Sequence, residues 1–560
     1  MNRRFDVDVL IAGGGPTGLV LAVELGRRGI GARIIDKAAE FFGGSRADGL
    51  TPRTQEVFED IGILAKIRAS GDDGILMRGY DGDRVIWEGR MTEPTAPTPD
   101  LPYAGVWFVP QYRTEEILRD RLGGLGGQVE LNTALVGFEQ DEDGVTVELL
   151  RDGDIERARA RYLVGADGGH SVVRGLLGVG FPGETDESTR ALFADVRIDG
   201  LDRDHGQVWM LPAGAGAGVG VGAVPLSGSD LFTVTAPPPD TQPPDTQPQD
   251  AEPQDAEPQD AEAADGTGDA VESTLDYLRR ILATASGRTD FHLRELTWST
   301  VWRANKRLAD AYRVGRVFLA GDAAHLTHPT GGQGMNTGIQ DAYGLGWKLA
   351  AVLGGAPATL LDTYQAERRP AAEAALAVSA KLLAKHQRGD EDALRRGVEV
   401  YQLGLNYRGG PLSAELRAAP GRVRAGDRAP DAPCRNASGR PVRLFELFAG
   451  PQWTLLCFGT DADGLVAKVG STEVRAYRVV RPDVAVDEHA VVDVDGYAYW
   501  AYGIADETVV LVRPDGYVGL GASPGSVAEV EDYLRSVLGR VRDRSGRCAA
   551  DHVASSPLTG

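Results

Sequence analysis

A glycine-rich turn follows directly on the first predicted strand of this chain. Gly13, Gly15 and Gly18 have the GxGxxG spacing, and Pro16 lies between the last two. Glycines at this spacing permit a tight turn and let a pyrophosphate reach the free N–H groups at a helix start. Asp36 ends the next predicted strand, where its carboxylate can accept hydrogen bonds from ribose hydroxyls. These residues predict a dinucleotide site, although they do not separate FAD from NAD.

The elements around this turn predict an α/β fold with a doubly wound, Rossmann-like sheet. Residues 6–12 are predicted to form a strand, 17–28 a helix and 32–35 the next strand, which together make a βαβ unit. Buried strands are also predicted at 162–166 and 316–320. Each of these two runs into a glycine-rich turn that contains an aspartate.

Three motifs, in this order, resemble those of the class A flavoprotein monooxygenases, the aromatic hydroxylases related to p-hydroxybenzoate hydroxylase and phenol hydroxylase. They are the 13–18 turn, GADGGHSVVR at 165–174 and GRVFLAGDAAH at 315–325, continued by PTGGQGMNTG at 329–338. The resemblance covers about residues 5–385 and implies an FAD enzyme reduced by NAD(P)H, with NADPH favoured. It implies that O2 adds to form a C4a-hydroperoxyflavin, which hydroxylates a phenolic or polycyclic aromatic, polyketide-like substrate.

The resemblance also implies which positions contact the cofactor. Asp322 would bond the flavin ribityl chain, and Asp167 and Gly168 would lie near the pyrophosphate and serve the nicotinamide cofactor. A helix predicted from the 331–336 turn to about 352 would aim its N–H groups at the flavin and stabilise the reduced anion. From the residues alone, Asp322 could instead cap a helix. The other implied positions are Arg46, Gln111, Val136, Gly321, Pro329, Gly332, Gly334, Met335 and Asn336.

Asp48 is the candidate catalytic residue. The segment 47–54 is similar to one in phenol 2-monooxygenases in which the aspartate deprotonates the phenol, which would make Asp48 the general base. The alternative is an ordinary Asp-Gly turn after a cofactor-binding arginine. We expect His170, His325 and His328 to be structural hydrogen-bonding residues, although His328 replaces a proline more usual in the family.

Two other outcomes stay open at this point. The same flavin chemistry supports Baeyer–Villiger oxygen insertion or epoxidation. A protein with the same fold could also bind flavin without oxygenase activity and sequester an aromatic ligand.

The chain is expected to form three domains and one insert. The FAD domain is predicted to be discontinuous, and the substrate domain, with a mixed sheet, holds an acidic insert at 236–270 that we expect to be disordered. The region 425–539 resembles the thioredoxin-like domain of phenol and polyketide-tailoring hydroxylases, a type associated with antibiotic biosynthesis, but lacks CxxC. The predicted ranges are 1–75, 105–180 and 300–400 for FAD, 76–104 and 181–299 for substrate, and 420–545 for the thioredoxin-like domain.

Charge and cysteine content exclude several classes of protein. The formal charge is −22, which argues against nucleic acid or an anionic membrane as partner, and the insert supplies ten of the acidic residues. Cys434, Cys457 and Cys548 are sparse and argue against a disulfide framework or a cysteine metal site, and we expect no metal. We expect a cytoplasmic protein whose C-terminal domain is structural and is a candidate dimer interface.

Overall fold

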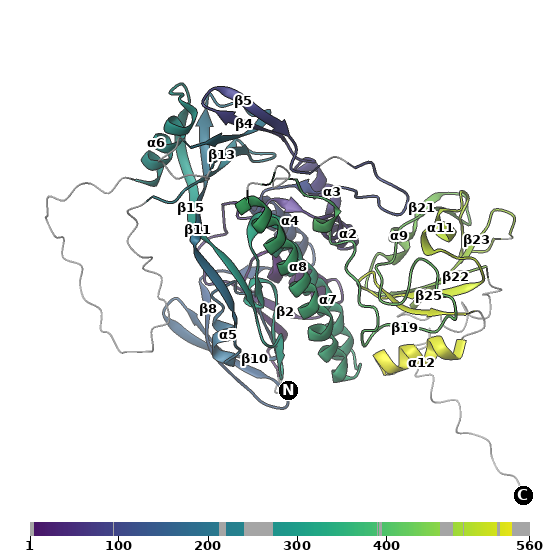
Figure 1. Cartoon of the computed structure of the whole chain (residues 1–560). Coiled ribbons are helices and arrows are strands. Elements are labelled where there is room, and N and C mark those ends of the chain that lie inside the picture. The colour runs from purple at the N-terminus through teal and green to yellow at the C-terminus, as the bar shows by residue number, and fades with distance from the viewer. Residues whose placement is uncertain are drawn as a thin grey trace, which may run out of the picture.

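The computed structural model describes residues 5–92, 95–211, 220–239, 273–388, 390, 395–459, 474–484, 486–523 and 527–539. The predicted acidic insert lies outside the described residues from position 240 onward, as does Cys548. Within the described part, three eight-stranded sheets hold most of the strands. Figure 1 shows them as three separate groups.

The first sheet is built on the strand that precedes the glycine turn. β1 (Val7–Ala12) pairs in parallel with β10 (Asp154–Gly165) on one side and β2 (Ala32–Ile35) on the other. Val9 to Ala12 are buried, as expected for a central parallel strand covered by helices. The further strands are β17 (Val317–Leu319), β16 (Arg313–Val314), β7 (Val129–Glu130), β9 (Val145–Arg151) and β8 (Thr133–Gln140). The predicted Rossmann-like unit is confirmed.

Long helices pack around this sheet. The predicted helix after the glycine turn is α1 (Pro16–Gly26), and it ends two residues earlier than expected because Arg27 is its C-cap. The other long helices are α4 (Gln111–Gly123), α7 (Gly334–Leu353) and α8 (Asp362–Arg388). Shorter helical segments are α2 (Pro52–Asp60), α3 (Leu64–Ala69), α5 (Val172–Leu177), η3 (Ala358–Leu361) and η4 (Val398–Val400).

The second sheet contains the two longest strands. β11 (Gly183–Asp199) and β15 (His292–Leu308) pair antiparallel along most of their length. β15 passes through position 300, where the FAD domain was predicted to resume, so one continuous strand runs across that boundary. The sheet continues with β18 (His325–Leu326), β14 (Leu231–Ala236), β13 (Gly220–Pro225), β12 (His205–Met210), β4 (Leu76–Asp81) and β5 (Arg84–Gly89).

The two faces of the second sheet have different roles. Leu192, Ala194 and Val196 of β11 share a hydrophobic core with the helix α6 (Thr274–Ser286). Since side chains alternate along a strand, Phe193 and Asp195 lie on the opposite face. Trp209 of β12 also packs in the α6 core.

The C-terminal sheet is mixed. β22 (Trp453–Phe458) pairs in parallel with β23 (Val474–Val480) and antiparallel with β25 (Thr508–Val512). Cys434 and Cys457 are buried, and burial raises the pKa of each thiol to about 12, so both act as small apolar side chains. The other elements are β19 (Ala414–Glu415), β26 (Val518–Ala522), β24 (Ala490–Val492), β20 (Pro433–Asn436), β21 (Pro441–Arg443), α9 (Leu444–Phe448), α11 (Tyr497–Tyr502) and α12 (Val527–Leu538).

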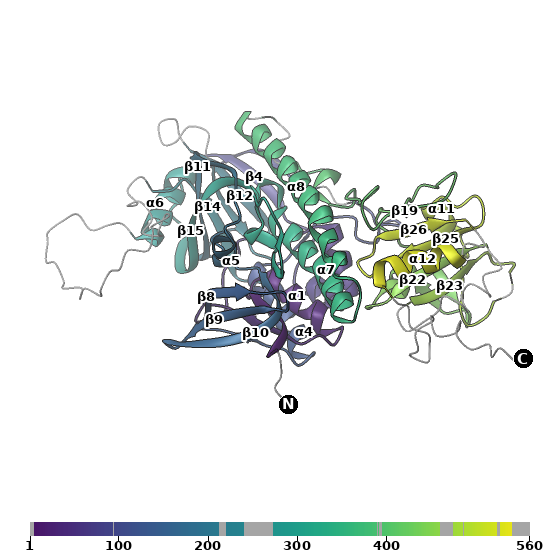
Figure 2. The same ribbon diagram turned by 90° about the horizontal axis from the view of Figure 1, so that it is seen from below.

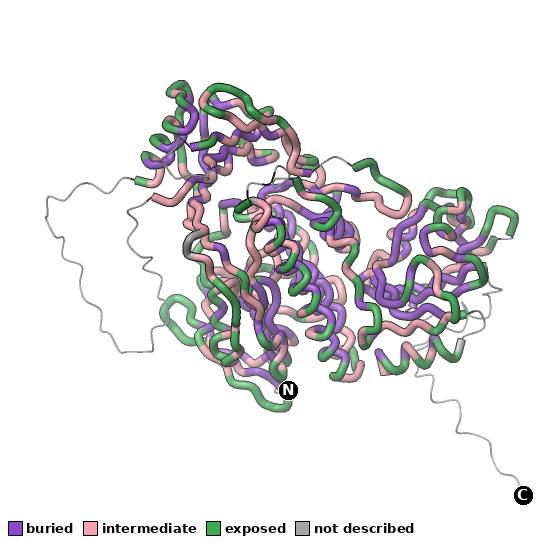
Figure 3. Tube along the Cα trace, in the orientation of Figure 1, coloured by how far each residue is buried: buried purple, intermediate pink, exposed green. Residues whose placement is uncertain are grey.

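α7 and α8 separate the C-terminal sheet from the other two sheets, and both views of the ribbon agree on this (Figures 1 and 2). α7 is buried from Asn336 to Leu349. Figure 3 shows the same pattern, with buried segments running through the central strands and α7. α7 packs against α1, and Tyr343 and Trp347 of α7 donate hydrogen bonds to the third unit.

Candidate active site

A cavity of about 540 Å³ lies at the carboxyl ends of β1, β2 and β10. Ligands of open α/β sheets bind at this edge, because the loops that leave the strands diverge there. The cavity brings together eight of the predicted cofactor positions, from four separate parts of the chain. They are Gly13, Gly15, Asp36, Arg46, Gln111, Val136, Asp167 and Gly168.

The three glycines of the turn meet different demands. Gly13 has φ of 111°, and a Cβ there would lie 2.2 Å from the Ala166 carbonyl oxygen. A Cβ on Gly18 would lie 2.0 Å from the Gly13 carbonyl oxygen, so this glycine lets α1 pack against the turn. A Cβ on Gly15 would meet nothing within 4 Å, because this residue faces the cavity. Pro16 is the first residue of α1 and needs no N–H partner there.

Asp36 pins the glycine turn from the end of β2. Its Oδ2 accepts the Gly14 N–H at 2.7 Å, and its Oδ1 accepts the Ala38 N–H at 2.9 Å. Each carboxylate oxygen can accept a second hydrogen bond. The side chain is therefore engaged with the loop and still able to accept ribose hydroxyls on the cavity side.

Arg46 lies on an aromatic platform at the cavity wall. Its guanidinium carbon is 4.9 Å from the centre of the Phe42 ring and 5.7 Å from that of Trp298. A guanidinium over ring faces is attracted by their negative electrostatic potential, which fixes its direction. The neighbouring Ser45 hydroxyl accepts the N–H of Gln111 at 3.2 Å, so these two predicted positions belong to one hydrogen-bonded unit.

Glu115 is a cavity residue that the sequence reasoning missed. It lies one helical turn after Gln111 on α4 and accepts the Gln111 side-chain N–H at 2.8 Å. Burial raises the pKa of its carboxyl to about 7, and the nearby Gln111, Arg119 and Arg46 moderate the rise. The i,i+4 spacing from Gln111 is the signal that could have identified it.

Asp167 lines the cavity, and its carboxylate is held by hydrogen bonds at the start of α5. Its Oδ1 accepts the Ser171 hydroxyl at 2.5 Å, and its Oδ2 accepts the Val173 N–H at 3.1 Å at the start of α5. Gly168 lines the cavity beside it. The positive end of the α5 dipole stabilises the Asp167 carboxylate in this position.

The second group of predicted positions starts at the short turn η1 (Gly321–Ala323). Gly321 has φ of 62°, and a Cβ there would lie 2.6 Å from the Thr17 hydroxyl. Ala320, not Asp322, is the N-cap residue of this turn, so the helix-capping alternative for Asp322 is not what the structure shows. The Asp322 side chain is exposed, and the charge of Arg46 acts on its carboxyl.

Asp341 of α7 holds η1 in place. Its Oδ2 accepts the Gly321 N–H at 3.1 Å and the His325 Nε2 at 2.7 Å, while its Oδ1 accepts Arg368 Nε at 2.7 Å. All three side chains are buried. Sequence reasoning assigned His325 a structural hydrogen bond, which the structure shows, but did not identify Asp341 or Arg368 as its support.

The start of α7 faces the same region. η2 (Pro329–Gly331) leads into Gly332, which has φ of 61°, and the first helical hydrogen bond runs from the Thr337 N–H to the Gln333 carbonyl. The N–H groups of the first helical residues, Gly334, Met335 and Asn336, thus lie outside the helical ladder, as at any helix N-terminus.

Asn336 uses its side chain to join α7 to the Asp48 segment. Its Oδ1 accepts the Thr51 N–H at 2.9 Å, and its Nδ2 donates to the carbonyls of Gly49 and Gly332 at 2.8 Å each. A buried amide with these three bonds is occupied. Only its backbone is free to serve a cofactor, so the side chain positions the strand β3 (Gly49–Leu50), which pairs with β6 (Trp107–Phe108).

Asp48 lines a second cavity, of about 190 Å³, between β3 and the second sheet. Burial raises the pKa of its carboxyl above the ordinary value, and the charge of Arg396 opposes the rise. Asp72, Arg90 and Phe108 line the same cavity. Arg396, which follows α8 by several residues, carries no motif, so its approach to Asp48 could not have been predicted from the sequence.

The remaining histidines make local contacts. His328 accepts the Thr330 N–H through Nδ1 at 3.1 Å and packs against Trp302, with ring centres 4.4 Å apart. His170 is exposed at the first cavity. In the part of the chain that the structure describes, no cluster of three or more His, Cys, Asp or Glu side chains could hold a metal.

The two groups of residues fit a flavin dinucleotide. The open side of Gly15, the Asp36 carboxylate with its remaining acceptor capacity and the fixed Arg46 suit the adenosine diphosphate half. Asp322 and the α7 N-terminus lie beyond Arg46, whose charge acts on the Asp322 carboxyl.

Among the helices described, none is both long and apolar enough to cross a membrane.

Comparisons with known proteins agree with this geometry. The family model "FAD binding domain" matches residues 6–379, and "Aromatic-ring hydroxylase, C-terminal" matches residues 422–541. The chain is 42% identical over 534 residues to a flavin-dependent monooxygenase of Mycobacteroides abscessus, covering 95% of this chain and 100% of that protein. It is 33% identical to a 12-dehydrotetracycline 5-monooxygenase/anhydrotetracycline 6-monooxygenase of Streptomyces rimosus, covering 95% and 99%.

Solved structures of hydroxylases resemble this chain over almost its whole length. Aklavinone-11 hydroxylase, in a ternary complex with FAD and aklavinone, superposes with a TM-score of 0.76 at 28% identity, covering 96% of this chain and 100% of that one. An anhydrotetracycline hydroxylase from Streptomyces rimosus superposes with a TM-score of 0.68 at 30% identity, covering 96% and 99%.

Proposed function

This chain belongs to the FAD-dependent aromatic-ring hydroxylases, and we propose that it hydroxylates a phenolic ring held between Asp48 and the second sheet. The observation that supports this most strongly is the placement of Asp48. Its carboxylate lines a cavity at the second sheet, and Asn336 ties the segment that follows it to the start of α7. A base at that position can reach a substrate hydroxyl beside the flavin ring.

FAD, when bound and reduced by NAD(P)H, supplies the activation of oxygen and the transfer of one oxygen atom to the ring. The residues of this chain bind and orient it. We assign the adenosine half to the Gly13–Gly18 turn, Asp36, Arg46 and Gln111, and the ribityl chain to Asp322. The N–H groups that begin α7 would lie at the flavin ring and would favour negative charge on it.

Asp48 acts on the substrate. It accepts the proton of the phenol, and the resulting phenolate pushes electron density into the ring position that receives oxygen. Burial raises its pKa, which makes the carboxylate a stronger base than an exposed one, and the charge of Arg396 opposes the rise. The Val109 N–H donates to the Asp48 carbonyl at 2.8 Å and holds the backbone in this position.

The substrate class follows from the relatives. Proteins of similar length and sequence are named for tetracycline precursors and for pentachlorophenol, and a solved structure holds aklavinone. All of these are phenols or polycyclic phenols. We therefore propose a phenolic, polyketide-like substrate.

The test is a panel of simple phenols and polycyclic phenols, each added to FAD-loaded enzyme with NADPH or NADH under air. We expect at least one polycyclic phenol to stimulate NADPH oxidation and to yield a product that carries one atom from labelled O2. A ring-expanded ester or an epoxide would favour Baeyer–Villiger insertion or epoxidation. Tight binding of aromatic ligands with no oxygen-dependent turnover for any of them would favour a sequestering protein and overturn the proposal.

Two further assignments accompany this function. We propose a cytoplasmic enzyme that forms a homodimer through its C-terminal unit. Cell fractionation tests the cytoplasmic location. Light scattering of the purified protein tests the homodimer, and a monomer at micromolar concentration would contradict it.

A further inference from the structure

Asp195 is a buried carboxylate on the face of the second sheet that lies opposite the α6 core. Its exposed fraction is 0%, and its strand neighbours Ala194 and Val196 point into the core. Its partners across the sheet are Thr233 on β14 and Trp298 on β15. An ionised group in such a place is costly unless donors reach it.

Two donors reach Asp195, and one of them comes from the loop that carries Arg46 to the first cavity. The Thr233 hydroxyl donates to Oδ1 at 2.8 Å, which is a bond within the sheet. The Ser45 N–H donates to Oδ2 at 2.6 Å, and Ser45 directly precedes Arg46. Asp195 therefore joins the substrate sheet to the loop that carries a predicted cofactor residue.

The same loop rests on the sheet at a second point. Phe42 and Trp298 meet edge to face with ring centres 5.6 Å apart, and the Arg46 guanidinium lies over both rings. A Cβ on Gly44 would lie 2.7 Å from Cγ of Trp298, so only glycine allows this approach. The loop packs so closely against Trp298 that a Cβ on Gly44 would displace it.

The position of the Ser45–Arg46 loop affects two residues that line the cofactor cavity. Arg46 and Gln111 both line that cavity, and the Ser45 hydroxyl accepts the Gln111 N–H. Ser45 thus donates through its N–H to Asp195 and accepts through its hydroxyl from Gln111. Any shift of Ser45 moves both cavity residues together.

We propose that Asp195 is a positioning residue that holds the Ser45–Arg46 loop on the substrate sheet and thereby keeps Arg46 and Gln111 in place for the pyrophosphate-containing cofactor. Asp195 does not touch the cofactor in this assignment. The inference rests on the proposed FAD site, because it concerns how residues of that site are held.

The test compares variants of Asp195 by FAD titration of the apoprotein, followed by flavin fluorescence and the visible flavin spectrum. Asp195→Ala removes the acceptor of the Ser45 N–H and should raise the FAD Kd about ten- to hundredfold, as expected for loss of a hydrogen bond to a charged group. Asp195→Asn keeps a carbonyl oxygen for Ser45 and should restore FAD affinity to within about threefold of wild type. Thr233→Val is the matched control, because it removes only the bond within the sheet.

Gly44→Ala tests the same seating without touching Asp195, and it serves if Asp195→Ala fails to fold. Its added carbon meets Trp298, so it should also weaken FAD binding and broaden the flavin spectrum. Folded Asp195→Ala and Gly44→Ala proteins with unchanged FAD affinity would overturn the inference, and so would an Asn variant as weak as the Ala variant.

Arg46→Ala separates this inference from the proposed function. If it weakens FAD binding while Asp195→Ala does not, the FAD site stands and the role of Asp195 falls. If the wild-type protein binds no FAD at all, the proposed function itself falls.

Discussion

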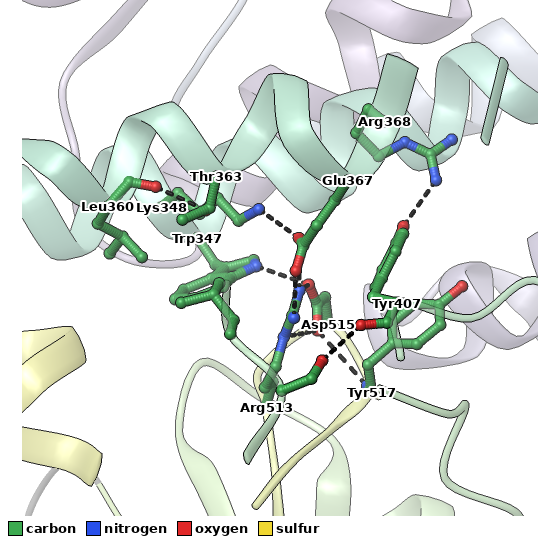
Figure 4. Close-up of polar contacts among 12 residues, drawn as sticks. Trp347, Lys348, Leu360, Thr363, Glu367, Arg368, Tyr407, Arg513, Asp515 and Tyr517 are labelled. Atoms are coloured by element: carbon green, nitrogen blue, oxygen red, sulfur yellow. Dashed lines mark hydrogen bonds and ion pairs between the residues drawn. The ribbon is translucent and has the colours of Figure 1, made fainter. Parts of the chain in front are cut away.

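Arg513 of the C-terminal unit makes a two-point ion pair with Glu367 of α8, with N–O distances of 2.6 and 2.9 Å (Figure 4). Both side chains are fully enclosed. Glu367 also accepts Lys348 Nζ of α7 at 2.5 Å, and Arg513 also contacts Asp515. The C-terminal unit is thus tied by buried charges to α7 and α8, the two helices whose Asp341 and Arg368 hold the η1 turn.

Removing one partner of this network should destabilise the whole chain. Arg513→Met removes the positive charge that compensates the buried carboxylates of Glu367 and Asp515. Losing one side of a buried ion pair typically costs about 3–5 kcal/mol of stability. We expect a lower Tm and a lower free energy of unfolding in urea. Arg535→Met removes an exposed pair with Asp532 and is the control, with an expected change below about 1 kcal/mol. Equal effects of the two variants would contradict the importance of burial.

Gly15→Val and Gly18→Val should fail in different ways. A side chain at Gly15 points into the cavity, so the variant should fold with near wild-type Tm and lose FAD. A side chain at Gly18 collides with the Gly13 carbonyl, so the variant should lose stability itself. Thermal denaturation of the apoproteins and flavin absorbance after purification separate the two. A stable, flavin-loaded Gly15→Val protein would exclude that glycine from the site.

Asp48→Asn should slow hydroxylation about 10²- to 10⁴-fold while leaving FAD bound, as expected for loss of a general base. Because the base acts deprotonated, wild-type kcat/KM should rise with pH as Asp48 ionises, and burial shifts that rise above the range of an ordinary aspartate. The variant should lose this limb of the pH profile. Turnover and FAD retention measured from pH 5 to 9 check both points, and unchanged turnover would remove Asp48 as the base.

Asp322→Ala should weaken FAD binding with little effect on Tm, because the side chain is exposed and forms no part of the Asp341 support. Asp341→Asn provides the contrast. Its carboxylate holds Gly321, His325 and Arg368, so this variant should lose both stability and FAD affinity. Isothermal titration with FAD and thermal denaturation distinguish them. FAD affinity that is unchanged in Asp322→Ala would count against its contact with the ribityl chain.

Stability should depend on pH through Asp195. Burial, with a smaller contribution from the nearby charge of Asp48, raises its pKa from 3.8 to about 6. A raised pKa means that the folded state holds the proton more tightly than the unfolded chain does. Protonated Asp195 therefore contributes to the free energy of unfolding at low pH, and this contribution is lost as pH rises to about 6. Relative to Asp195→Asn, the wild-type free energy of unfolding should fall by up to about 3 kcal/mol between pH 4 and pH 7. Urea titrations of both proteins at each pH measure the free energy of unfolding. If this free energy changed with pH in the same way for both proteins, the raised pKa would be contradicted.

Much of the fold could be predicted from local patterns. The strand at Val7–Ala12, the glycine turn and Asp36 identify themselves because each depends on neighbours within one βαβ unit. The family resemblance drawn from the motifs is confirmed by the matched family models. The roles of the individual site residues remain predictions.

Other features could not be predicted, because their physical cause is a contact between distant parts of the chain. Asp167 lies in the predicted motif, yet its carboxylate caps α5. Asn336 also lies in a predicted motif, yet its side chain is occupied by Gly49 and Thr51, residues nearly 300 positions away in sequence. Motif spacing specifies which backbone reaches a cavity, but the direction of a polar side chain depends on the partners that the fold supplies.

Residue type and short-range spacing are enough to predict the dinucleotide turn, the mixed α/β class, the family and the list of candidate site residues. The folded chain shows which of those residues share a cavity, and it adds Glu115, Asp195, Asp341 and Arg396. Three of them, Glu115, Asp195 and Arg396, carry no motif. Their importance comes from burial and from hydrogen bonds and charges across long separations, which exist only once the chain has folded.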